Sequence, residues 1–106
     1  WETCTIGRWV TLGHGCVVHN VASLGDYSVV GMNAVVSDWA QVGEWAVVAE
    51  GAVVRQRAVV PAGRIAAGVP ARLLDRVVDE PYRAEWWRFK QIYVDLCARY
   101  ADGYGR

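Results

Sequence analysis

Residues 47–60 read VVAEGAVVRQRAVV, and within this stretch a pair of valines returns every six residues. The spacing continues on both sides of the stretch. An amphipathic helix repeats every 3.6 residues and a half-buried strand every two, so a period of six fits neither. It is typical of a triangular coil built from three short strands and three corners. The valine pairs begin at Val17, Val29, Val35, Val47, Val53 and Val59.

The second valine of each pair belongs to a longer series of aliphatic residues. We expect this aliphatic ladder to point inward and to stack from coil to coil, with a small residue four positions later and a glycine easing the corner. A sandwich of valine-rich strands would show turn signals every 8–12 residues instead. The sequence therefore predicts an all-β solenoid, a left-handed parallel β-helix of hexapeptide repeats with a C-terminal α-helix. The ladder runs through Ile6, Leu12, Val18, Leu24, Val30, Val36, Val42, Val48, Val54, Val60 and Ala66.

The chain divides into three parts. The solenoid is predicted over residues 1–74, a linker over 75–78 and the helix over 79–103, with Asp79 as its N-cap and Pro81 in its first turn. The repeat is already running at Ile6 and Trp1 is not a methionine, so we expect earlier coils to be missing. We expect the aromatic stripe of the helix to pack against the solenoid or a neighbouring subunit. The stripe consists of Trp86, Phe89, Tyr93, Leu96, Cys97 and Tyr100.

Composition excludes several classes of function. Eleven basic residues balance eleven acidic ones, so no net charge attracts the chain to nucleic acid or to an anionic membrane. The sequence shows no targeting segment and no apolar run approaching the roughly 20 residues of a membrane span. The three cysteines lack a CxxC spacing, which indicates reduced thiols and a cytoplasmic protein. Cys16 falls at a small inward position, where we expect it to fill space.

The only histidines are His14 and His19, and both stand outside the ladder. Two surface histidines without a function are one interpretation. As metal ligands they would have to come from different subunits, because five extended residues span up to roughly 16 Å and each zinc ligand lies about 2 Å from the ion. A cyclic oligomer supplies such a contact. Imidazole suits zinc, cobalt or ferrous iron, and a catalytic site needs a third protein ligand.

Five segments resemble the gamma-class carbonic anhydrase-like family: Ile6-Gly7, TLGHGCVVH at 11–19, VGM at 30–32, AGVPAR at 67–72 and IYVDL at 92–96. The likeness extends from about Cys4 to Tyr100. The histidine segment followed by the Gly-Met step is the specific part. The AGVPAR segment is shared with hexapeptide acyltransferases in general.

This resemblance implies a homotrimer with zinc sites between its subunits. His14 and His19 would supply two ligands from different subunits, and the third histidine would lie upstream of Trp1. Tyr93 matches a tyrosine that reaches the site in some members, although core packing explains it equally well. The implied reaction is the hydration of carbon dioxide to bicarbonate by water that zinc activates. This fragment lacks the third ligand and the family's acidic proton-shuttle loop, so we expect it to be inactive alone.

Two other functions stay open. The same solenoid serves acyl-CoA-dependent hexapeptide acetyltransferases, which use one histidine as a general base, and related thioesterases. The chain could also be a non-catalytic subunit of a trimeric assembly. The paired histidines favour the carbonic anhydrase over the acetyltransferase, and the fold alone decides none of the three.

Overall fold

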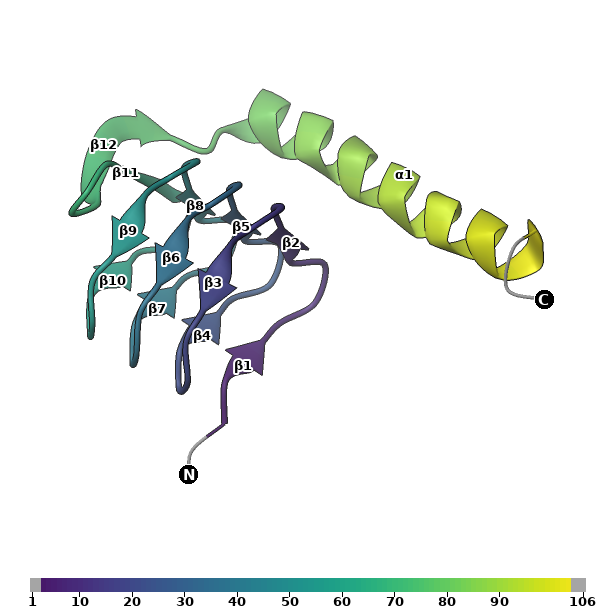
Figure 1. Ribbon diagram of the computed structural model, residues 1–106. Helices are drawn as coiled ribbons and strands as arrows, with labels where there is room; N and C mark the ends of the chain where they lie inside the picture. The colour runs from purple at the N-terminus through teal and green to yellow at the C-terminus, as the bar shows by residue number, and fades with distance from the viewer. Residues whose placement is uncertain (1–2, 104–106) are drawn as a thin grey trace.

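The computed structural model describes residues 3–103 and shows a stack of triangular coils with one long helix beside it (Figure 1). Ten strands of two residues each form the coils, and each strand contains one of the predicted hexapeptide pairs. The strands are β1 (Thr5–Ile6), β2 (Thr11–Leu12), β3 (Val17–Val18), β4 (Ser23–Leu24), β5 (Val29–Val30), β6 (Val35–Val36), β7 (Gln41–Val42), β8 (Val47–Val48), β9 (Val53–Val54) and β10 (Val59–Val60). Two longer strands follow, β11 (Arg64–Ala67) and β12 (Arg72–Val77).

The strands form three parallel sheets, one for each side of the triangle. Their orders are β1-β4-β7-β10, β2-β5-β8-β11-β12 and β3-β6-β9, with only β12 antiparallel to its neighbour. Each strand pairs with the strand one coil away, so that Thr5 lies opposite Ser23 and Val29 opposite Val47. The predicted parallel β-helix of hexapeptide repeats is confirmed.

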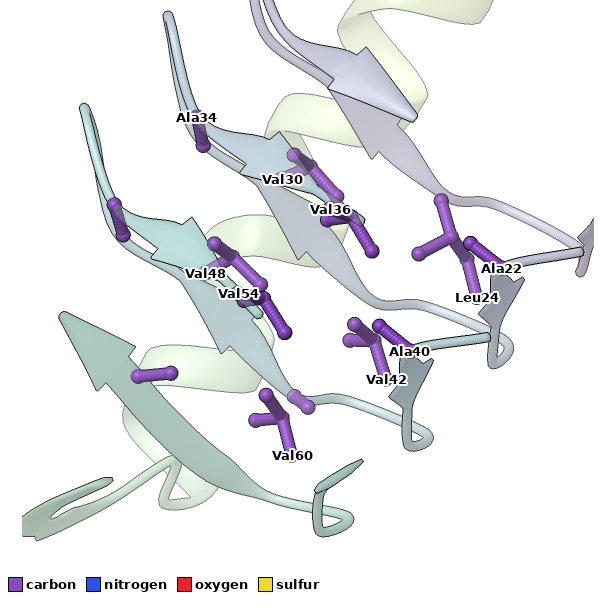
Figure 2. Close-up of a cluster of buried hydrophobic side chains, with 13 residues drawn as sticks. Ala22, Leu24, Val30, Ala34, Val36, Ala40, Val42, Val48, Val54 and Val60 are labelled. Carbon is purple, nitrogen blue, oxygen red and sulfur yellow. The ribbon is translucent and has the colours of Figure 1, made fainter. Parts of the chain in front are cut away.

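The aliphatic ladder fills the interior, as Figure 2 shows. Its members from Leu24 to Ala66 are buried, and alanines occupy the small inward positions between them. The first coil differs, because Ile6 and Leu12 are 49% and 46% exposed. These two side chains occupy ladder positions but pack against the ladder on one side only.

The glycines after the ladder serve a different purpose from the one predicted. They were expected to ease the bend, but a Cβ on Gly31 would lie 2.7 Å from the backbone nitrogen of Glu50 in the next coil. Close approach of the neighbouring backbone therefore demands glycine there. The left-handed conformation falls two residues later, at Asn33 with φ 60° and at Trp45 with φ 58°. Glycine does follow the ladder residue, but the prediction that it eases the bend was wrong.

The chain leaves the last coil through β12, which spans the predicted boundary between solenoid and linker. Residues 75–77 of the expected linker are thus part of a strand paired with β11. The helix α1 (Glu80–Gly103) follows, and the Asp79 carboxylate accepts a hydrogen bond from the backbone N–H of Tyr82 at 3.1 Å. This contact matches the predicted N-cap. The part of the chain that the structure describes contains no helix long and apolar enough to cross a membrane.

The first half of α1 packs on the β2-β5-β8-β11 side of the stack. Trp86 and Tyr82 contact a cluster of outward side chains, Val29, Val47 and Ile65. Trp87 packs edge-on against Trp9 at 4.7 Å between ring centroids, and against Tyr27 at 5.7 Å.

The second half of α1 extends beyond β2 (Figure 1), and all side chains from 91 to 99 are exposed. The stripe predicted from the sequence thus divides. Trp86 packs on the solenoid, whereas Phe89, Tyr93, Leu96 and Cys97 are exposed in a single chain. The side chain of Tyr100 lies outside the described residues.

The three sides of the triangle differ in chemistry. The outward residues of the β1 sheet include Thr5, Ser23 and Gln41, and α1 covers the outward residues of the β2 sheet. The β3 sheet instead presents Val17, Val35 and Val53, which we call the valine face. Val17 is exposed and the other two are half-buried.

Candidate functional site

His14 lies at the corner between β2 and β3, directly after Gly13. The same corner position holds Met32 one coil later and Glu50 two coils later, since coils repeat at 18 residues. These three residues form one wall of a cavity of about 450 Å³ between the corner and α1. The rest of the lining is mainly apolar and includes Trp9, Leu12, Trp86 and Val94.

Tyr93 lines the same cavity from α1. The structure thereby brings His14 and Tyr93, two residues singled out in the sequence, to one site. The Tyr93 side chain is 60% exposed, so core packing within this chain does not account for it. The roles predicted for His14 and Tyr93 stay predictions.

His19 lies apart from this cavity, at the corner between β3 and β4. Its Nδ1 atom is 3.5 Å from Oδ1 of Asp38 in the next coil, and both side chains are about half exposed. A carboxylate beside Nδ1 favours the tautomer with its proton on that nitrogen and leaves Nε2 free to bind a metal or a proton. Sequence reasoning missed Asp38, although it follows His19 by one coil and one residue.

The two histidines thus stand at opposite edges of the valine face. Among the side chains that the structure describes, those of residues 3–99, no group of three or more His, Cys, Asp or Glu gathers closely enough to hold a metal ion. The donor set is two accessible imidazoles on separate corners, one of them backed by a carboxylate. This set fits two ligands of a zinc site shared between chains, and it does not fit a complete site within one chain.

Lys90 is the other notable residue of the cavity, and it is the only lysine in the sequence. It is 4% exposed. Its ammonium donates hydrogen bonds to the carbonyl of Trp9 at 2.6 Å, the Thr11 hydroxyl at 2.7 Å and, more weakly, the carbonyl of Ser28 at 3.4 Å. Burial lowers the pKa of Lys90 from 10.5 to about 8. Lys90 was not identified from the sequence. The available signal was that Lys90 precedes Tyr93 by three residues and so lies on the same face of the helix.

Solved structures similar to this chain include several acetyltransferases. A putative acetyltransferase from Bacillus cereus superposes with a TM-score of 0.84 and 26% identity over 93% of this chain and 62% of its own. Perosamine N-acetyltransferase from Caulobacter crescentus, crystallised with CoA and GDP-perosamine, gives 0.65 and 27% over 69% of this chain and 34% of its own. A hexapeptide transferase family protein from Anaplasma phagocytophilum gives 0.71 at 20% identity, covering 92% of this chain and 82% of its own.

These similarities support the hexapeptide-repeat fold. They favour the acetyltransferase alternative over the carbonic anhydrase one, because the Caulobacter protein is described as an acetyltransferase and the Bacillus protein as a putative one. No protein-family model matches the chain. This chain spans about a third of the Caulobacter enzyme and under two thirds of the Bacillus protein.

Proposed function

We propose that the protein is a zinc-dependent hydratase of the gamma-class carbonic anhydrase type, acting on carbon dioxide as a homotrimer. The observation that carries this proposal is the position of His14 and His19 at the two edges of the valine face. A sheet face of partly exposed valines favours burial against another subunit.

A threefold arrangement accounts for both features. When three copies turn their valine faces toward a common axis, the His14 edge of each copy comes beside the His19 edge of the next. Each contact between copies then contains one imidazole from either side, with the cavity of His14 and Tyr93 next to it. A third ligand would complete the site.

The residues of this chain have distinct roles in the proposed site. His14 and His19 hold the ion, and Asp38 orients His19 through Nδ1. A zinc ion held there would supply a nucleophile at neutral pH, because zinc lowers the pKa of its bound water to about 7. Tyr93 lies on the cavity wall and would orient the substrate by its hydroxyl. The apolar lining from Trp9, Leu12 and Met32 suits an uncharged molecule such as carbon dioxide better than an anion.

Mixing two inactive variants tests the shared site. Full-length His14→Ala and His19→Ala should each lose zinc and carbon dioxide hydration. After the two proteins are unfolded together and refolded, mixed trimers contain one contact with both histidines intact. Random assembly should then restore about a quarter of the wild-type zinc and activity, because three quarters of the trimers are mixed and each has one intact contact of three.

The control for this experiment is the double variant His14→Ala/His19→Ala refolded with wild type. There a contact is intact only where two wild-type chains are neighbours, so shared ligands predict about a quarter of the wild-type zinc, whereas ligands held within one chain predict about a half. Recovery absent from the mixture of single variants would disprove shared ligands. Wild-type zinc content in either single variant would disprove the metal site itself, and trimers without zinc would indicate an assembly subunit.

A second candidate is acyl transfer from coenzyme A, and the comparisons support it more directly than the first. Two of the similar structures are acetyltransferases at 26% and 27% identity. In this chain, His19 with Asp38 on Nδ1 would be the general base, since Nε2 is free to take a proton. If this function is correct, calorimetry should detect binding of acetyl-CoA, and the protein should release free thiol when an amine or alcohol acceptor is added. A chelator should affect neither result. Loss of activity on zinc removal would contradict it.

A further inference from the structure

Lys90 anchors the C-terminal helix on the first two coils of the solenoid. We propose that it is a positioning residue, which holds Tyr93 in place over the cavity wall formed by His14. The inference depends on the proposed function only in treating Tyr93 and His14 as site residues. The anchoring itself concerns this chain alone.

The hydrogen bonds of Lys90 all run from the helix to the solenoid. Trp9 and Thr11 belong to the first coil and Ser28 to the second, so one ammonium ties α1 to two successive coils. An ammonium has three N–H groups, and here each has one acceptor. Lys90 is therefore saturated and has no donor left for a substrate, which assigns it to positioning and not to catalysis.

The location of Lys90 along the helix makes it the contact that controls the position of Tyr93. It is the last buried residue of α1 among those whose side chains the structure describes, because residues 91–99 are all exposed. Tyr93 lies less than one turn further on and shares the helix face of Trp86 and Lys90. Without Lys90, the nearest attachment of α1 is the packing of Trp86 and Trp87.

A lysine at this position indicates that α1 is held by directional hydrogen bonds and not by apolar packing alone. A methionine would fill a similar space without the cost of burying a charge, and no carboxylate of residues 3–99 forms an ion pair with Lys90. Three directed bonds fix the distance and rotation of the helix, whereas an apolar contact tolerates sliding. This is what a site assembled from two elements requires.

The test compares Lys90→Met with Gln91→Met, an exposed neighbour on the same helix. Amide hydrogen exchange in residues 86–99 should accelerate about 10- to 100-fold in Lys90→Met, as expected for lost bonds to a charged group. The solenoid peptides and the Gln91→Met protein should exchange like wild type. Unchanged exchange at 86–99 would overturn the proposal.

A 3-fluorotyrosine placed at position 93 reports on the proposed consequence. Its fluorine resonance should be distinct from that of free fluorotyrosine in wild type and in Gln91→Met, and should shift to the free value in Lys90→Met. A general packing defect that leaves Tyr93 in place would not move this signal, and an unmoved signal overturns the positioning role. If Lys90→Met fails to fold, the wild-type protein still decides.

The wild-type measurement uses the fact that the chain has one lysine. With ¹³C-labelled lysine, the side-chain signal belongs to Lys90 alone, and a buried anchor should titrate well below the ordinary pKa of 10.5. A signal that titrates at the ordinary value means that Lys90 is in solvent and refutes the anchor. None of these three readouts needs zinc or activity, so failure of the proposed function leaves this test intact.

Discussion

The imidazole of His19 and the carboxylate of Asp38 face each other across two coils, with Nδ1 and Oδ1 3.5 Å apart. The contact exists because adjacent coils place residues 18 positions apart side by side, and Asp38 is one residue beyond that register. A carboxylate in this position orients the ring, whether the imidazole acts as a metal ligand or as a general base. Either proposed chemistry therefore depends on it.

Asp38→Asn should weaken zinc binding about 10- to 100-fold, because an amide does not support the ring as a carboxylate does. A competition titration with a chromogenic chelator measures this. Asp95→Asn, an exposed change on α1, serves as the control and should bind zinc like wild type. Equal affinities in all three proteins would remove Asp38 from the site.

The valine face should decide the oligomeric state. Val35→Glu places a charge in the middle of this face, and burying it between subunits without a partner is costly. Light scattering should show monomers for this variant, and trimers for Gln41→Glu on the polar β1 side. A trimeric Val35→Glu protein would show that the valine face is not the subunit interface.

The loss of stability caused by truncating a ladder side chain should increase with the burial of that side chain. Leu24→Ala removes a side chain that is 1% exposed and should lower the free energy of unfolding by about 2–5 kcal/mol. Leu12→Ala, at an equivalent ladder position but 46% exposed, should cost less than half of that. Urea unfolding of the two variants provides the comparison, and equal losses would show that Leu12 is covered in solution.

Substitutions at two glycines distinguish the cost of a steric clash with the next coil from the cost of a left-handed backbone conformation. In Gly31→Ala the new methyl group meets the backbone of the next coil, so the coils must move apart. In Gly51→Ala the methyl group enters open space, and only the left-handed backbone with φ 70° carries a cost, of roughly 1–2 kcal/mol. Thermal unfolding should therefore show a larger loss for Gly31→Ala, and the reverse order would contradict the close approach.

Lys90 makes stability depend on pH in a definite direction. Its pKa is about 8 in the folded chain and 10.5 when exposed, so between these values the unfolded chain binds more protons. The free energy of unfolding should accordingly rise with pH across this window, relative to Lys90→Met. Lys90 shares its cavity with His14, Glu50 and Tyr93, and the subtraction of Lys90→Met removes their contributions. A difference that stays flat from pH 8 to 10.5 would contradict the burial of the ammonium.

The fold was predictable because one period governs most of the chain. A spacing of six fixes strand, corner and inward residue together, so the valine pairs alone define the coils from β3 to β10. Local spacing says less about how closely two backbones approach, so it predicts that the glycines ease the corner, whereas Gly31 is needed because the next coil lies against it. The strand β12 was missed because its sequence, RLLDRV, no longer follows the repeat.

The site was predictable only in part. His14, His19 and Tyr93 stand out by residue type and by resemblance, whereas Asp38 and Lys90 gain meaning through contacts between coils or with α1. Register arithmetic finds Asp38 once the coil is known to contain 18 residues. The contacts of Lys90 depend on how the helix docks, and no repeat in the sequence encodes that.

The fixed offset between neighbouring coils also restricts how such a chain can change its length. Removing 18 residues deletes one coil and leaves every later residue on its original side of the triangle. Removing six preserves the repeat and the ladder but turns everything upstream by one side relative to everything downstream. If the six residues lay between His14 and Glu50, His14 would no longer share a corner with Glu50 or lie beneath the helix, so a deletion compatible with folding would still dismantle the cavity.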